Sequence, residues 1–138
     1  DYIFDIDRFT SFEGNTGPYI LYTIVRIKSI LNKNHSLGKD ETGAVIESAH
    51  SMSEKNLMLE LSRFNAMMEN AFEESAPHKV CSYIYDLANA FNSFYHETKI
   101  MSEENEAVQK SYIRLLTLTK SVLEACIGVL GFEAPERM

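Results

Sequence analysis

Long hydrophobic runs are missing from this sequence. The longest apolar segments, such as the one from Tyr19 to Val25, are far shorter than the roughly 20 residues of a membrane-spanning helix. No basic segment followed by an apolar one opens the chain, as a secretory signal would. We therefore expect a cytoplasmic protein that makes no membrane contact.

Cysteine is scarce as well. Cys81 and Cys126 are the only two cysteines in 138 residues, and each lies within an apolar helical pattern. This placement predicts two buried, reduced thiols with a structural role, and no metal site.

Positive charge is in deficit, with 13 Lys and Arg against 20 Asp and Glu and a formal net charge of −7. Such a balance provides no overall attraction to phosphate backbones. Composition alone therefore argues mildly against nucleic acid as a ligand, and we expect no binding to DNA.

The motifs of common catalytic centres are also absent. The chain contains no Gly-rich phosphate loop, no Gly-x-Ser-x-Gly and no His-Glu-x-x-His. The four histidines fall in predicted loops or near predicted helix ends, where we expect solvated surface groups. The chain is therefore not expected to act as an enzyme by itself.

Helical periodicity is what the sequence does contain. An apolar share of 45% over 138 residues fits one globular domain, which we assign to residues 1–138. No segment alternates apolar and polar residues for long enough to predict a strand. We predict an all-α bundle of four to five helices, in which neighbours joined by short connections pack antiparallel.

Four segments carry the helical pattern, at about residues 18–31, 51–74, 77–99 and 102–131. Pro18 suits the first turn of a helix, whereas the residues up to Asn15 show no helical period and predict an extended arm. Residues 32–51 form a polar connector. Gly131 is typical of a helix C-terminal stop.

Two helix starts and two apolar stripes complete this pattern. Ser51 and Glu54 have the spacing of a capping box, and Ser102 followed by two glutamates predicts a second capped start. Steps of three and four residues predict one core-facing stripe in each of two helices. These stripes are Leu57, Leu61, Phe64, Met68 and Phe72, and Val80, Ile84, Leu87, Phe91 and Phe94.

The first predicted helix combines aromatic residues with an arginine. Tyr19, Tyr22 and Arg26 fall within roughly 60° of one another around a helix axis. Two rings beside a guanidinium can stack unpaired bases and hold a phosphate, as single-stranded RNA loops require. Tyrosines at this spacing also occur at the edge of an amphipathic core, so the stripe alone leaves both interpretations open.

Three passages carry motifs in a defined order. The first is residues 11–22 (SFEGNTGPYILY), with residues 1–5 (DYIFD) before it and Arg26 beyond it. The second is residues 77–78 and 81–88 (CSYIYDLA), with Phe91 and residues 94–95. The third is residues 129–132 (VLGF) and 135–138 (PERM). Together they resemble the C-terminal, DALR-type anticodon-binding domain of arginyl-tRNA synthetases.

The resemblance implies a helical bundle of the class I synthetase anticodon-binding type, which packs against the anticodon loop of arginine tRNA. Residues 1–17 would be the junction from an upstream catalytic domain, and 32–51 a variable connector. A first residue that is Asp rather than Met agrees with a piece of a longer chain. The absent catalytic domain would use ATP to ligate arginine to the tRNA in protein biosynthesis, so this piece would hold no cofactor.

By the same resemblance, five positions approach the anticodon loop: Tyr19, Tyr22, Arg26, Tyr95 and Met138. Tyr19 and Tyr22 would stack or wedge bases, and Arg26 would hold a phosphate or a base edge. Tyr95 and Met138 would shape the pocket.

Two residues depart from the family pattern. Leu21 stands where the family commonly has glutamine, so any hydrogen bond made there is lost, and we expect it to repack the bundle. Tyr112 stands where an arginine is common in the last helix, and both an altered RNA contact and repacking are open for it. The residues also allow a second function, a helical protein-interaction module whose aromatic stripe docks a partner helix.

Overall fold

The computed structural model describes residues 6–39 and 44–131, with side chains from residue 17 onward. Five helices make up most of this part of the chain: α1 (Ile6–Ser36), α2 (Met52–Ser62), α3 (Phe64–Glu73), α4 (Pro77–Glu97) and α5 (Glu106–Val129). No strand occurs in the described ranges. The predicted all-α bundle is confirmed. None of the described helices is long and apolar enough to cross a membrane.

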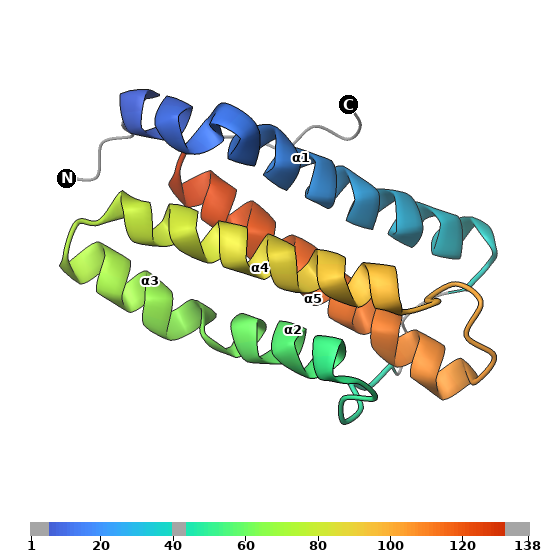
Figure 1. Cartoon of the computed structure of the whole chain (residues 1–138). Helices are drawn as coiled ribbons and strands as arrows, with labels where there is room; N and C mark the ends of the chain where they lie inside the picture. The colour runs from blue at the N-terminus through green and yellow to red at the C-terminus, as the bar shows by residue number, and fades with distance from the viewer. Residues whose placement is uncertain (1–5, 40–43, 132–138) are drawn as a thin grey trace.

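Helix α4 occupies the centre of the bundle and packs against each of the other four helices (Figure 1). Helices α2 and α3 follow one another along one side of α4 and run antiparallel to it. Helix α5 is also antiparallel to α4, as the short connections predicted, whereas α1 runs in the same direction as α4. The seam between α1 and α4 therefore brings together side chains about 70 residues apart in sequence.

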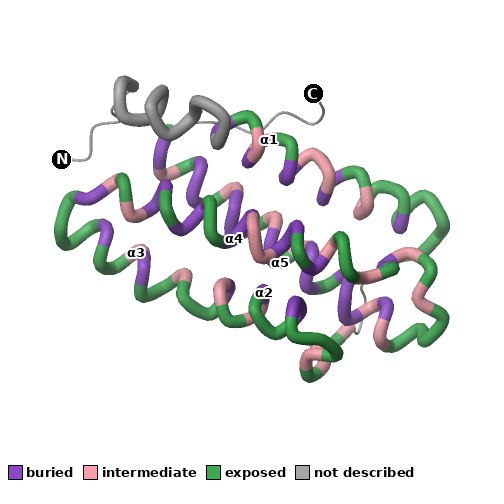
Figure 2. The backbone as a smooth tube through the Cα atoms, viewed as in Figure 1, coloured by how far each residue is buried: buried purple, intermediate pink, exposed green. Residues whose placement is uncertain are grey.

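The core lies where the inner faces of the helices meet (Figure 2). All five residues of the predicted α4 stripe are at most 1% exposed: Val80, Ile84, Leu87, Phe91 and Phe94. Cys81 and Cys126 are buried thiols, as predicted. Burial raises the pKa of the Cys126 thiol to about 12, so this thiol stays protonated at neutral pH.

Helix α1 begins earlier than predicted. The expected extended arm is wrong from Ile6 onward, because α1 starts there and Pro18 lies inside the helix. Proline removes one backbone N–H and crowds the carbonyl four residues earlier, here that of Gly14. Helix α1 also continues to Ser36, past the predicted end at Leu31 and into the expected connector.

A turn at Arg63 divides the helix predicted over 51–74 into α2 and α3. In a continuous helix the carbonyl of Glu60 would accept from the amide four residues on. Here that carbonyl accepts from the Tyr83 hydroxyl at 2.6 Å and from the Arg63 amide at 3.2 Å. A side chain that enters the helical hydrogen-bond ladder in this way is a recognised cause of a break. The Arg63 guanidinium covers the Tyr83 ring at 5.8 Å and pairs with the Glu60 carboxylate.

The break changes which residues face the core. Leu57 and Leu61 are buried as predicted, but Phe72 is 59% exposed, and Met67 and Ala71 fill the core side of α3. The predicted stripe assumed an unbroken helical period, which the turn at Arg63 interrupts.

The start of α5 also differs from the prediction. Asn105, not Ser102, caps this helix, and its side chain accepts from the Val108 amide at 3.1 Å. The side-chain amide of Gln109 donates to the carbonyls of Ile100 and Met101 at 3.1 and 3.0 Å. These bonds hold the segment around Ser102 outside the helix. The end of α5 is as predicted, with Gly131 at a positive φ of 87° just beyond it.

The break at Arg63 can be tested through two phenylalanines. Phe91→Ala should lower the free energy of unfolding by about 3–5 kcal/mol, because it deletes a fully buried ring. Phe72→Ala should change it by less than about 0.5 kcal/mol, because that ring is exposed. Urea denaturation measures both, and a large loss for Phe72→Ala would contradict the register of α3.

Candidate nucleic-acid interface

A groove of about 590 Å³ follows the seam between α1 and α4. Helix α1 contributes three side chains from one face, because the spacing of three and four residues matches the helical period. Helix α4 contributes residues from the face opposite. The lining residues are Tyr19, Tyr22, Arg26, Asn89, Asn92, Ser93, His96 and Glu97.

Arg26 lies between two aromatic rings within this seam. Its guanidinium carbon is 5.1 Å from the centre of the Tyr22 ring and 4.3 Å from the centre of the Tyr95 ring. One guanidinium nitrogen donates to the side-chain oxygen of Asn92 at 2.7 Å. No carboxylate of the described residues forms an ion pair with Arg26. Within the described residues, the groove thus presents a cation held by rings and an amide and not ion-paired with a carboxylate, and Glu97 is the acidic residue of its lining.

Tyr19 is fixed by hydrogen bonds, whereas Tyr22 is open to solvent. The Tyr19 hydroxyl donates to the side-chain oxygen of Asn89 at 2.7 Å and accepts from the amide nitrogen of Asn92 at 3.0 Å. Its ring lies 6.1 Å from that of Tyr85. Tyr22 is 55% exposed, so its ring offers a surface on which a planar ligand could stack.

Four of the five predicted site residues come together at this seam. Tyr19, Tyr22 and Arg26 line the groove, and Tyr95 backs Arg26 from α4. The fifth, Met138, lies outside the described residues.

Five polar residues of α4 complete the groove and were not predicted: Asn89, Asn92, Ser93, His96 and Glu97. Three of them, Asn89, Asn92 and His96, are spaced by three and four residues, which places them on one face of α4. The spacing that identified Tyr19, Tyr22 and Arg26 on α1 is therefore present on α4 as well.

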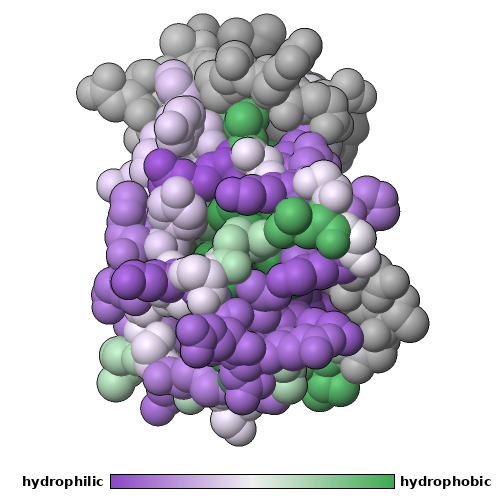
Figure 3. All heavy atoms as spheres, turned by 90° about the vertical axis from the view of Figure 1, so that its right-hand side faces the viewer, coloured by the Kyte–Doolittle hydropathy of each residue, from purple (hydrophilic) through white to green (hydrophobic). Residues whose placement is uncertain are grey.

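A second hollow of about 420 Å³ adjoins the first and includes Tyr95 in its lining. It shares His96 with the groove and includes Lys33 of α1 and Met101 beyond α4. Figure 3 views the molecule from the end where α1 and α4 finish, and shows hydrophilic residues around a small hydrophobic area. The cations of α1 therefore continue past Arg26 toward this end.

The two residues that depart from the family pattern lie outside the groove. Leu21 is half-buried and packs against the core. Tyr112 is buried, with its ring 5.4 Å from Phe94 and 5.8 Å from His50. The structure thus gives both residues packing contacts.

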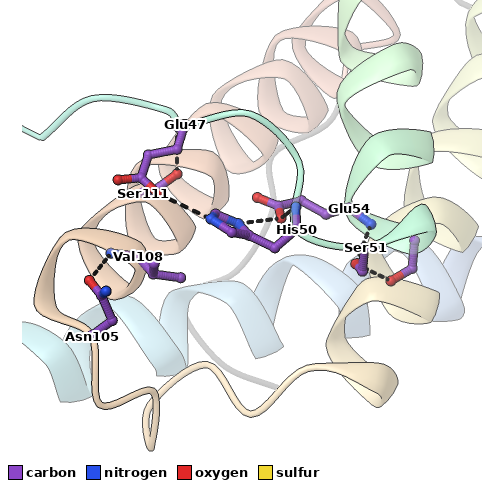
Figure 4. Close-up of polar contacts among 8 residues, drawn as sticks. Glu47, His50, Ser51, Glu54, Asn105, Val108 and Ser111 are labelled. Carbon is purple, nitrogen blue, oxygen red and sulfur yellow. Dashed lines mark hydrogen bonds and ion pairs between the residues drawn. The ribbon is translucent and has the colours of Figure 1, made fainter.

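His50 is exposed, as predicted, and it has two carboxylate neighbours (Figure 4). Its Nδ1 is 3.0 Å from an oxygen of Glu54, and its Nε2 is 3.1 Å from an oxygen of Glu47. Glu54 is fully buried, and the same oxygen accepts from the His50 backbone amide at 2.7 Å. These hydrogen bonds, led by Glu54, raise the pKa of His50.

This cluster changes one predicted cap and anchors the connector. The Ser51 hydroxyl accepts from the Glu54 amide at 3.1 Å, as the capping box predicts, but the Glu54 carboxylate turns to His50 instead of Ser51. The amide of Glu47 donates to the Ser111 hydroxyl of α5 at 2.9 Å. Across the described residues, no group of three or more His, Cys, Asp or Glu side chains could hold a metal ion.

Comparison with known proteins identifies relatives of the chain. The family model described as "DALR anticodon binding domain" matches residues 20–138. An arginine–tRNA ligase of Agathobacter rectalis is 69% identical over the whole chain, which covers 24% of that protein. An arginine–tRNA ligase of Alkaliphilus oremlandii is 57% identical over the whole chain, which covers 23% of it. The chain thus spans about a quarter of the length of these curated relatives.

Solved structures have the same fold. The arginyl-tRNA synthetase of Thermus thermophilus matches 92% of this chain with a TM-score of 0.79 and 32% identity, over 22% of its own length. The arginyl-tRNA synthetase of Plasmodium falciparum matches 91% of this chain with a TM-score of 0.77 and 32% identity, also over 22% of its length.

The His50 cluster predicts a pH-dependent stability. Because the folded-state pKa of His50 lies above the unfolded value of 6.5, its stabilisation is complete below pH 6.5 and is lost as the pH rises through the folded-state pKa. Urea unfolding of the native chain and of His50→Gln, from about pH 5.5 to 8.5, should show a difference in unfolding free energy that shrinks with rising pH. A constant difference across this range would rule out a protonated His50 as the cause.

Proposed function

The chain belongs to the DALR anticodon binding domain family, and we infer from this membership and its groove that it recognises the anticodon loop of arginine tRNA. It does so as the anticodon-binding part of an arginine–tRNA ligase. Its relatives of that name support the proposal.

One observation supports this function above the others: a guanidinium that lies against two tyrosine rings and forms no ion pair with a carboxylate of the described residues. Unpaired bases bind to proteins by stacking on aromatic rings and guanidinium planes, and by hydrogen bonds to their edges. The groove between α1 and α4 offers all three contacts within one seam.

Each groove residue has a role in the proposed contact. The exposed ring of Tyr22 stacks a base, and Tyr19, fixed by two asparagines, wedges beside it. Arg26 has five N–H donors, of which one faces Asn92, so others can meet a base edge or a phosphate. Tyr95 supports Arg26 from α4. For Met138, which lies outside the described residues, the proposed role in shaping the pocket rests on the family resemblance alone.

The middle anticodon base gives Arg26 a specific target. Every arginine codon has guanine in the middle, so the cognate anticodon has cytosine there. The pairing edge of cytosine carries two adjacent acceptors, O2 and N3, which match neighbouring guanidinium donors. We propose that Arg26 reads this edge.

The acidic net charge is compatible with this proposal. Stacking does not depend on net charge, and Arg26 and Lys33 place two cations along the same helix. Phosphate contacts position a nucleic acid, whereas base contacts identify it. We assign much of the phosphate contact, together with ATP binding and the ligation of arginine, to the remaining three quarters of the cytoplasmic enzyme.

The proposal is tested by low-salt binding of the chain to an anticodon stem-loop of arginine tRNA, beside a copy with the middle anticodon base changed. The native chain should prefer the cytosine-bearing loop. Tyr22→Ala should weaken binding by about 1–3 kcal/mol through loss of stacking. Arg26→Ala should weaken binding and reduce the preference for cytosine.

A matched control is Phe72→Ala, which removes an aromatic ring of similar exposure from α3 and should leave RNA binding unchanged. If Tyr22→Ala and Arg26→Ala bind both loops as the native chain does, the groove does not recognise the anticodon. Binding of a partner helix that these two variants abolish would favour a protein-interaction module.

A further inference from the structure

We propose that Asn92 is a positioning residue for anticodon recognition, because its buried side-chain amide holds Arg26 and Tyr19 in the orientation that meets the RNA. This inference rests on the proposed function of the groove. Asn92 itself is 7% exposed and lies beneath both residues, so it acts through them.

Four polar groups lie within hydrogen-bonding distance of the Asn92 side-chain amide. Its oxygen accepts from the Arg26 guanidinium at 2.7 Å. Its nitrogen carries two N–H groups and faces three acceptors, so one N–H is shared between two of them. These acceptors are the Tyr19 hydroxyl at 3.0 Å, the Thr23 hydroxyl at 2.9 Å and the Ala88 carbonyl at 3.0 Å. One amide from α4 thus contacts three residues of α1, Tyr19, Thr23 and Arg26, which lie about one helical turn apart on the side that faces α4.

The chemistry of the partners permits one orientation of this amide. Arg26 can only donate, so the Asn92 oxygen must face it, and the Ala88 carbonyl can only accept, so the nitrogen must face the opposite way. Thr23 already donates to the Tyr19 carbonyl at 2.8 Å, and the Tyr19 hydroxyl donates to Asn89 at 2.7 Å. Both hydroxyl oxygens are therefore acceptors toward Asn92. The partners therefore fix which end of the amide carries the oxygen.

This network fixes the side chains that must be in place before RNA arrives. Arginine has many rotamers, and ordering it on binding lowers affinity. The Asn92 oxygen and the two rings hold the Arg26 guanidinium in a single position before binding. A guanidinium so held can select between base edges, because its donors keep a defined direction.

A purely structural role for a buried asparagine is the competing explanation, and the chain contains a matched control for it. Gln109 of α5 is 5% exposed and donates to the Ile100 and Met101 carbonyls. It is as buried as Asn92 and similarly hydrogen-bonded, but it does not line the groove. A general loss of packing would affect both variants alike.

The experiment compares Asn92→Ala, Asn92→Ser and Gln109→Ala in thermal unfolding and in binding to the two stem-loops. Serine is the milder variant, because its hydroxyl can still bond to the Ala88 carbonyl but is too short to reach Arg26. All three variants should unfold at a lower temperature. Asn92→Ala and Asn92→Ser should also bind the cytosine loop roughly threefold to tenfold more weakly and discriminate less between loops, while Gln109→Ala should bind as the native chain does.

A double variant tests whether Asn92 acts through Arg26. In the Arg26→Ala background, Asn92→Ala should weaken RNA binding less than it does in the native chain. The inference is overturned if folded Asn92 variants bind both loops like the native chain, or if Gln109→Ala weakens binding equally. Failure of the proposed function looks different, since Tyr22→Ala and Arg26→Ala would then also leave binding unchanged.

Discussion

Enclosure of α4 by the other four helices is the constraint on which the rest of the structure depends. The apolar stripe from Val80 to Phe94 lies at the centre of the core, and α4 packs against each of the other four helices. Since the stripe occupies one side of α4, the polar residues of the adjacent side are brought against α1. The position of the groove therefore follows from the packing of the core.

The groove derives its chemical character from what surrounds Arg26. A charge between rings is partly shielded from water, so its contacts with a ligand are stronger than those of an exposed arginine. The cost of burying the Asn92 amide is offset because both its oxygen and its nitrogen are hydrogen-bonded. Local arrangement, and not the net charge of −7, decides what this surface can bind.

Much of the fold and most of the site could be predicted from the sequence. Periodicity located the α4 stripe, and the spacing of Tyr19, Tyr22 and Arg26 identified one wall of the groove. Two errors arise where a side chain bonds to backbone carbonyls: the Tyr83 hydroxyl breaks the helix at Glu60, and Gln109 holds Ser102 outside α5. The third is that α1 runs through Pro18, which local preference disfavours. The role of Asn92 could not be predicted from the sequence, because the α1 side chains that it bonds to lie almost 70 positions away.

The burial of both thiols has a practical consequence. Cys126 is fully enclosed and keeps its proton at neutral pH, and Cys81 is almost as deeply buried. Maleimide reagents attack exposed thiolates, so the two natural cysteines of the folded chain should react with them very slowly. A cysteine introduced on the outer face of α3 would then carry a fluorophore without removal of the natural thiols. Distances from that label to a labelled RNA loop could be followed in the otherwise native protein.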